Sequence, residues 1–98
     1  MCQRASTRYD AAMSKFPITP SQSRAARALL EWSQSDLAKA SNVGLSTVRG
    51  FENTLRFPHF NNLKAMRDAL EEAGIELIDE TPSEPGGVGA RFREKAPR

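Results

Sequence analysis

The stretch between Ser33 and Asn53 constrains the fold most, because it predicts two short helices joined by a tight turn. Ser33 can cap the first helix, since its hydroxyl can accept a hydrogen bond from a free amide of the first turn. Asn42 suits the left-handed conformation that ends a helix, because its short polar side chain tolerates a positive φ. Gly44 can then cap the second helix. Two short helices joined in this way form the helix-turn-helix motif.

The second helix of this pair is expected to present one face to its surroundings. Helical spacing turns Val48, Phe51 and Glu52 toward the core. The positions expected to face outward are Leu45, Ser46, Arg49 and Gly50. Because the second helix of a helix-turn-helix enters the major groove of DNA, these outward positions are candidates for reading bases.

Several residues at fixed spacing carry a resemblance to a known family. They are Gln34, Leu37, Ala38, Asn42, Val43, Ser46, Thr47, Val48, Phe51, Glu52, Asn53 and Pro58. Over roughly residues 20–74 the chain resembles the Cro/C1-type (XRE) helix-turn-helix repressors. The resemblance implies an all-α, lambda-repressor-like bundle of about five helices. It also implies that the protein binds a double-stranded DNA operator as a homodimer.

An ion pair between Arg27 and Glu52 is expected from the same resemblance. The physical reason is that a guanidinium near a core needs a carboxylate partner. The resemblance also assigns Gln34 to a phosphate anchor at the start of its helix. Thr54 stands where the family often has glycine, so the turn after the second helix is expected to be less sharp.

The candidate DNA contacts divide into those that read bases and those that position the protein. Arg49 can bond guanine through two N–H groups or hold a phosphate, Ser46 can donate or accept, and Leu45 can contact a thymine methyl group. The alternatives are an ordinary solvated arginine at position 49 and a helix-favouring serine at position 46. Gly50 removes a side chain where the family often has a polar reader. The candidates for phosphate contact are Gln34, Gly44, Thr47, Asn53 and Arg56.

The sequence divides into four segments on either side of these helices. Residues 1–19 are expected to form a flexible N-terminal arm and residues 20–74 the DNA-binding domain. Pro17 and Pro20 mark the boundary, and Ser21 can cap the first helix. Residues 75–93 are expected to form a β-ribbon, and residues 94–98 a flexible tail.

The β-ribbon is predicted from two short segments. Ile75–Asp79 alternates apolar and acidic residues, and Val88–Arg93 can return beside it after a turn rich in proline and glycine. Glutamate on one strand can then face arginine on the other. Because an isolated hairpin is only marginally stable, the ribbon should pack on the helices or pair with a second subunit. The helix before it and the ribbon are both candidates for the dimer interface.

Composition limits the other classes of function. The chain of 98 residues allows one domain, and its net charge of +2 is weak evidence for a polyanionic partner. The sequence shows no Cys/His dyad, no metal-ligand spacing and no phosphate loop, so we expect no enzyme, no metal site and no cofactor. The single cysteine, Cys2, cannot form an internal disulfide. With no apolar run long enough for a membrane helix, we expect a cytoplasmic protein.

A second interpretation of the same scaffold stays open. A helix-turn-helix can bind another protein instead of DNA, as an antiactivator or an antitoxin does, because a fold does not fix a function. The weak net charge and Gly50 keep this alternative open, in which a protein partner is the main ligand.

Overall fold

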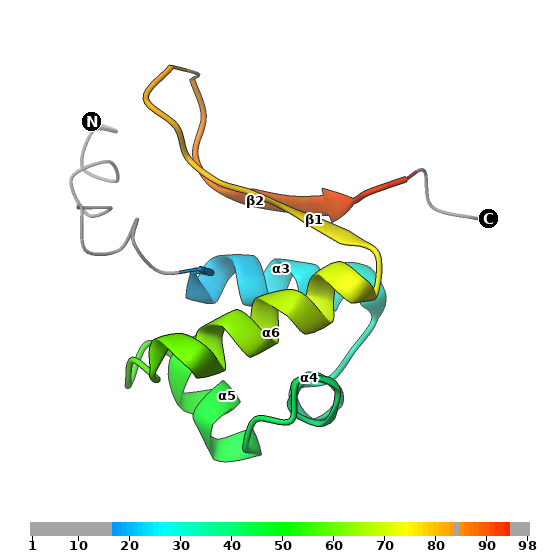
Figure 1. Cartoon of the computed structure of the whole chain (residues 1–98), viewed down its shortest axis with the longest axis vertical. Coiled ribbons are helices and arrows are strands. Elements are labelled where there is room, and N and C mark those ends of the chain that lie inside the picture. Colours follow the sequence, from blue (N-terminus) through cyan, green and yellow to red (C-terminus); the bar gives the residue numbers. More distant parts are fainter. Residues whose placement is uncertain (1–16, 84, 95–98) are drawn as a thin grey trace.

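The structure is a computed structural model that describes residues 17–83 and 85–94. In that part of the chain, four helices precede a two-stranded antiparallel sheet (Figure 1). The helices are α3 (Pro20–Leu30), α4 (Gln34–Ser41), α5 (Leu45–Glu52) and α6 (Phe60–Glu72), and the strands are β1 (Ile75–Ile78) and β2 (Gly89–Phe92). The fold is therefore mostly helical, with fewer helices in the described residues than the resemblance implies and with a small sheet.

The elements stack in three layers (Figure 1). The β1–β2 hairpin lies on one side of α3 and α6, and α4 and α5 lie on the other side. Apolar side chains from all of these elements fill the space between the layers. The largest of those that are fully buried are Phe51, Ile18, Leu37, Leu63, Met66, Leu70, Ile75 and Val48. Removing this apolar surface from water is the main force that holds α5 against the other helices.

The first described helix begins differently from the prediction, because Thr19 and not Ser21 caps it. The Thr19 hydroxyl accepts a hydrogen bond from the Gln22 amide at 3.1 Å, and the Gln22 side chain accepts one from the Thr19 amide at 3.0 Å. Pro20 occupies the first helical position, where the missing N–H has no cost. Ile18 is only 1% exposed. Ile18 and Thr19 therefore belong to the folded domain and not to the arm predicted over residues 1–19, of which residues 1–16 lie outside the described part.

Three consecutive helices end in the same way. At each end a residue other than glycine adopts the left-handed conformation, and the next residue donates its amide to a carbonyl five residues back. These left-handed residues are Glu31, Asn42 and Thr54, with φ of 59°, 59° and 60°. The prediction for Asn42 is confirmed. The prediction of a less sharp turn after α5 is wrong, because Thr54 adopts the conformation usually taken by glycine.

The hairpin packs on the helices of its own chain. Ile75 and Leu77 of β1 are buried, and Glu76 lies opposite Arg91 with an ion pair of 2.9 Å. The Gln22 side-chain amide donates to the carbonyls of Ile78 at 2.9 Å and of Gly89 at 3.2 Å. This glutamine therefore joins α3 to both strands, so one face of the ribbon is covered within a single chain.

Candidate nucleic-acid interface

The turn between α4 and α5 forms as its residues predict. Ser33 caps α4, and its side chain accepts from the Asp36 amide at 3.0 Å while Asp36 accepts from the Ser33 amide at 2.9 Å. The hydrogen bond from the Ser33 backbone lowers the pKa of Asp36, so this carboxylate stays charged at the positive end of the helix. Val43 is buried, and Gly44 is the N-cap of α5.

The predicted base-reading residues do not share one environment. Ser46 and Arg49 are exposed, so the described chain leaves both side chains open to a ligand. Leu45 is half-buried and packs against the core, so only the exposed part of its side chain can contact a ligand. Asn53 is also exposed, whereas Thr47 is half-buried near Gly44.

Gly50 is buried, contrary to the prediction that it is an open position on the outward face. A Cβ atom at Gly50 would lie only 2.8 Å from Cγ and Nε of Arg56 and 2.9 Å from its Cδ. The Arg56 side chain thus lies across the outward face of α5 at this point. Gly50 cannot itself read a base, and Arg56 occupies the direction that a side chain at position 50 would take.

Behind this face, a buried carboxylate fixes the end of α5 to α3. The Glu52 side chain is fully buried, and its Oε1 lies 2.7 Å from Nη2 of Arg27. Ser23 of α3 also donates to Glu52, and Arg24 donates to the Glu52 carbonyl. Arg27 in turn donates to the Trp32 carbonyl at 3.0 Å. The pair expected between Arg27 and Glu52 is therefore one part of a larger network.

Gln34 belongs to the same network. Its side-chain amide donates to Glu52 Oε1 at 3.1 Å, and the residue is half-buried. The backbone amide at the first position of α4 is a second group of Gln34 that can meet a phosphate. The contributions of Ser23, Arg24 and Gln34 to this network were not predicted from the sequence. Ser23 and Arg24 could have been identified as further partners of Glu52, because they lie one turn before Arg27 on the same helix.

Burial and hydrogen bonding act in opposite directions on the pKa of Glu52. Desolvation raises this pKa, but hydrogen bonds from Arg27, Ser23 and Gln34, together with the charge of Arg27, outweigh that effect and lower it. Glu52 is therefore a charged, satisfied structural group.

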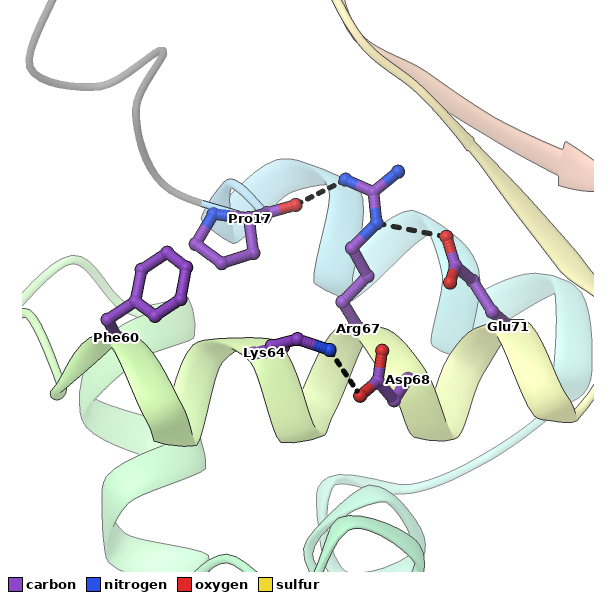
Figure 2. Close-up of a pocket in the computed structure, with 6 residues that line it drawn as sticks. All are labelled: Pro17, Phe60, Lys64, Arg67, Asp68 and Glu71. Atoms are coloured by element: carbon purple, nitrogen blue, oxygen red, sulfur yellow. Dashed lines mark hydrogen bonds and ion pairs between the residues drawn. The ribbon is translucent and has the colours of Figure 1, made fainter.

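A shallow pocket lies on α6, between that helix and Pro17 (Figure 2). Its lining residues are Pro17, Phe60, Lys64, Arg67, Asp68 and Glu71. Lys64 pairs with Asp68 at 3.0 Å, and Arg67 pairs with Glu71 at 2.9 Å. Arg67 also donates to the Pro17 carbonyl at 2.5 Å. Because each charge in this pocket has a partner in the protein, the pocket lacks an uncompensated charge for an ionic ligand.

A family model described as Helix-turn-helix, of the Cro/C1 type, matches residues 24–76. The match covers more than half of the chain. The chain belongs to the Cro/C1-type (XRE) helix-turn-helix family. Its α4 and α5 are therefore the two helices of the motif, and α5 corresponds to the second, recognition helix. No curated protein shows a significant similarity to the chain.

Membership in this family of DNA-binding regulators supports a general role as a helix-turn-helix regulator. Within residues 17–83 and 85–94, none of the helices is both long and apolar enough to cross a membrane. In the same residues there is no group of three or more histidine, cysteine or acidic side chains that could hold a metal ion.

Proposed function

We propose that this protein is a sequence-specific transcriptional regulator that binds double-stranded DNA as a homodimer, with α5 in the major groove. The observation that supports this function most is the exposure of Ser46 and Arg49 on α5, while Glu52 at the end of the same helix is buried and bonded to α3. A rigid helix with an open polar face is what direct reading of bases requires.

The exposed residues differ in the contacts they can make. Arg49 can donate two hydrogen bonds to guanine O6 and N7, and Ser46 can bond several bases. Leu45 can touch a thymine methyl group with the part of its side chain that is not packed on the core. Backbone amides at Gly44 and Gln34, with the side chains of Thr47 and Asn53, are suited to phosphate contacts.

The homodimer is proposed because one recognition helix covers only a few base pairs. Two helices related by a two-fold axis read two half-sites about one DNA turn apart. The inner face of the hairpin is already buried against α3 and α6. A second copy would therefore use the strand edges, the outer face of the hairpin or the exposed side of α6.

Gel retardation with DNA from directly upstream of the coding sequence tests this proposal. We expect specific retardation that weakens strongly between about 50 and 200 mM salt, because binding releases counterions from phosphates. Arg49→Ala should lower the affinity by roughly five- to a hundredfold, the value of one good contact to a base. Lys64→Ala, which removes an exposed cation paired on α6, is the matched control. Equal affinity of the Arg49→Ala variant and the wild type would contradict the assignment.

A protein partner is the second candidate, and one observation favours it. Leu55, Phe57 and Phe60, in and after the loop that follows α5, are 78%, 60% and 55% exposed. Large exposed apolar side chains are typical of surfaces that bind proteins. If DNA is retarded only when a co-purified protein is present, the chain is an adaptor, such as an antiactivator or antitoxin. Retardation by the purified chain alone supports the regulator.

A further inference from the structure

Arg56 has an unusual position for a residue that follows a recognition helix. Ser46 and Gly50 are one turn apart, so they are neighbours on the same outward face of α5. The aliphatic part and Nε of Arg56 fill the space that a side chain at Gly50 would need. The Arg56 side chain therefore crosses the face that the proposed function directs into the major groove.

The backbone holds Arg56 in this position. Thr54 adopts a left-handed conformation, and the chain then turns back over the end of α5. The amides of Leu55 and Arg56 both donate to the Gly50 carbonyl, at 2.7 and 3.3 Å. Arg56 thus lies over the same residue whose missing side chain makes room for it.

The guanidinium of Arg56 also differs from most others in its bonding. The arginines that donate to an acceptor of the protein are Arg24, Arg27, Arg67, Arg91 and Arg93. Among the described residues, Arg49 and Arg56 are the arginines whose guanidinium makes no such bond. Both lie on the outward side of α5. Two planar donor groups are therefore available together on one surface.

We propose that Arg56 reads a base from the loop, through the gap that Gly50 leaves in α5, and so determines part of the sequence specificity. This inference rests on the proposed function. Gly50 acts as the positioning residue, and Arg56 supplies the side chain that α5 lacks there. A guanidinium in the major groove can donate to guanine O6 and N7, which identifies guanine as the base most suited to it. The phosphate contact expected for Arg56 from the sequence is the competing role.

Variants of the full chain separate the two roles. Binding is measured on the upstream DNA fragment and on copies in which each base pair of the protected site is changed singly. Arg56→Ala should remove the preference at one or two base pairs, where the wild type discriminates roughly five- to a hundredfold. Arg56→Lys should restore overall affinity but not that preference, because lysine is a point charge without the planar fork.

Gly50→Ala is the second, independent variant. Alanine favours helix more than glycine does, and the atoms it would displace belong to a flexible side chain, so the melting temperature should stay equal or rise. The base preference should nevertheless fall as in Arg56→Ala, and the double variant should be no worse than either single one. Lys64→Ala is the control for loss of a positive charge.

Two results would overturn the inference while leaving the proposed function intact. One is a uniform loss of affinity at every base pair in Arg56→Ala with a shallower salt dependence, which identifies a phosphate contact. The other is an unchanged base preference in Gly50→Ala. If the wild type shows no specific retardation, the proposed function itself fails, and this inference fails with it.

Discussion

At the scale of single residues, Glu52 connects stability to the position of α5. Its carboxylate accepts from two residues of α3 and one of α4, and the described structure leaves none of its side-chain oxygens unsatisfied. A buried charge of this kind stabilises the fold only while every partner is present. The same carboxylate therefore sets the orientation of the face that carries Arg49.

The low pKa of Glu52 predicts how stability changes with pH. Because the pKa is lower in the folded protein than in the unfolded chain, the charged form stabilises the fold at neutral pH. This contribution should begin to fall as the pH approaches the ordinary glutamate value of about 4.3, and it is lost below the folded pKa. The free energy of unfolding, obtained from urea unfolding curves between pH 7 and pH 3, measures this contribution.

Glu52→Gln is the control for that pH series. At pH 7 this variant should lose about 2 kcal/mol, because a charged acceptor is replaced by a neutral amide beside Arg27. Its stability should also change less on acidification than that of the wild type. If the free energies of unfolding of the two proteins fall in parallel on acidification, a group other than Glu52 causes the pH dependence.

Thr54 is a second residue whose local conformation predicts a change in stability. A β-branched side chain is unfavourable at its φ of 60°. Thr54→Gly should therefore raise the free energy of unfolding by about 0.5–1 kcal/mol, after allowing for the greater freedom of glycine in the unfolded chain. Thermal unfolding tests this, and Asn53→Gly, at a φ of −91°, should give no gain. A loss of stability in Thr54→Gly would contradict this account of the turn.

At the scale of elements, local chemistry explains which predictions succeeded. Ser33, Asn42 and Gly44 determine the ends of α4 and α5 through hydrogen bonds and φ preferences that depend on near neighbours. The two strands were likewise predicted from their alternation and turn residues. The prediction that Ser21 caps α3 was wrong because Thr19 and Ser21 are both good capping residues. The Gln22 side chain decides between them by bonding to Thr19.

Gln22 also shows what local patterns cannot predict. Its amide reaches Ile78 and Gly89, which are 56 and 67 residues away in sequence. Gln22→Ala should remove the hydrogen bonds to these two carbonyls and to the Thr19 amide, and it should cost about 1–3 kcal/mol. Hydrogen exchange should then accelerate in the hairpin more than in α5. Ser21→Ala, at the exposed neighbouring position, is the control, and equal effects of the two variants would contradict the role of Gln22.

At the scale of the whole molecule, the hairpin and α5 lie on opposite sides of α3 and α6 (Figure 1). Ile75 and Leu77 belong to the core, being 0% and 5% exposed. The ribbon is therefore part of the folded domain, and a cut before Ile75 would expose the core as well as remove a candidate dimer surface. Point variants on the outer strand positions are the better test of dimerisation.

The candidate site was predictable in outline and not in detail. Helical spacing was sufficient to identify Ser46 and Arg49 as outward residues, because that spacing depends only on α5 itself. The covering of Gly50 by Arg56 depends on how the next loop turns back, and the spacing of residues within α5 carries no information about it. The hydrogen bond of the Gln34 side chain similarly depends on Glu52, which lies 18 residues later.

Amide chemical shifts, followed while the upstream DNA fragment is added to the isotope-labelled chain, test whether α5 is the element that reads DNA. We expect the largest shift changes at residues 44–56 and the smallest at residues 75–78 and 89–92 of the hairpin. Changes concentrated in the hairpin, or no changes at all at stoichiometric DNA, would contradict the assignment of α5 as the DNA-reading element.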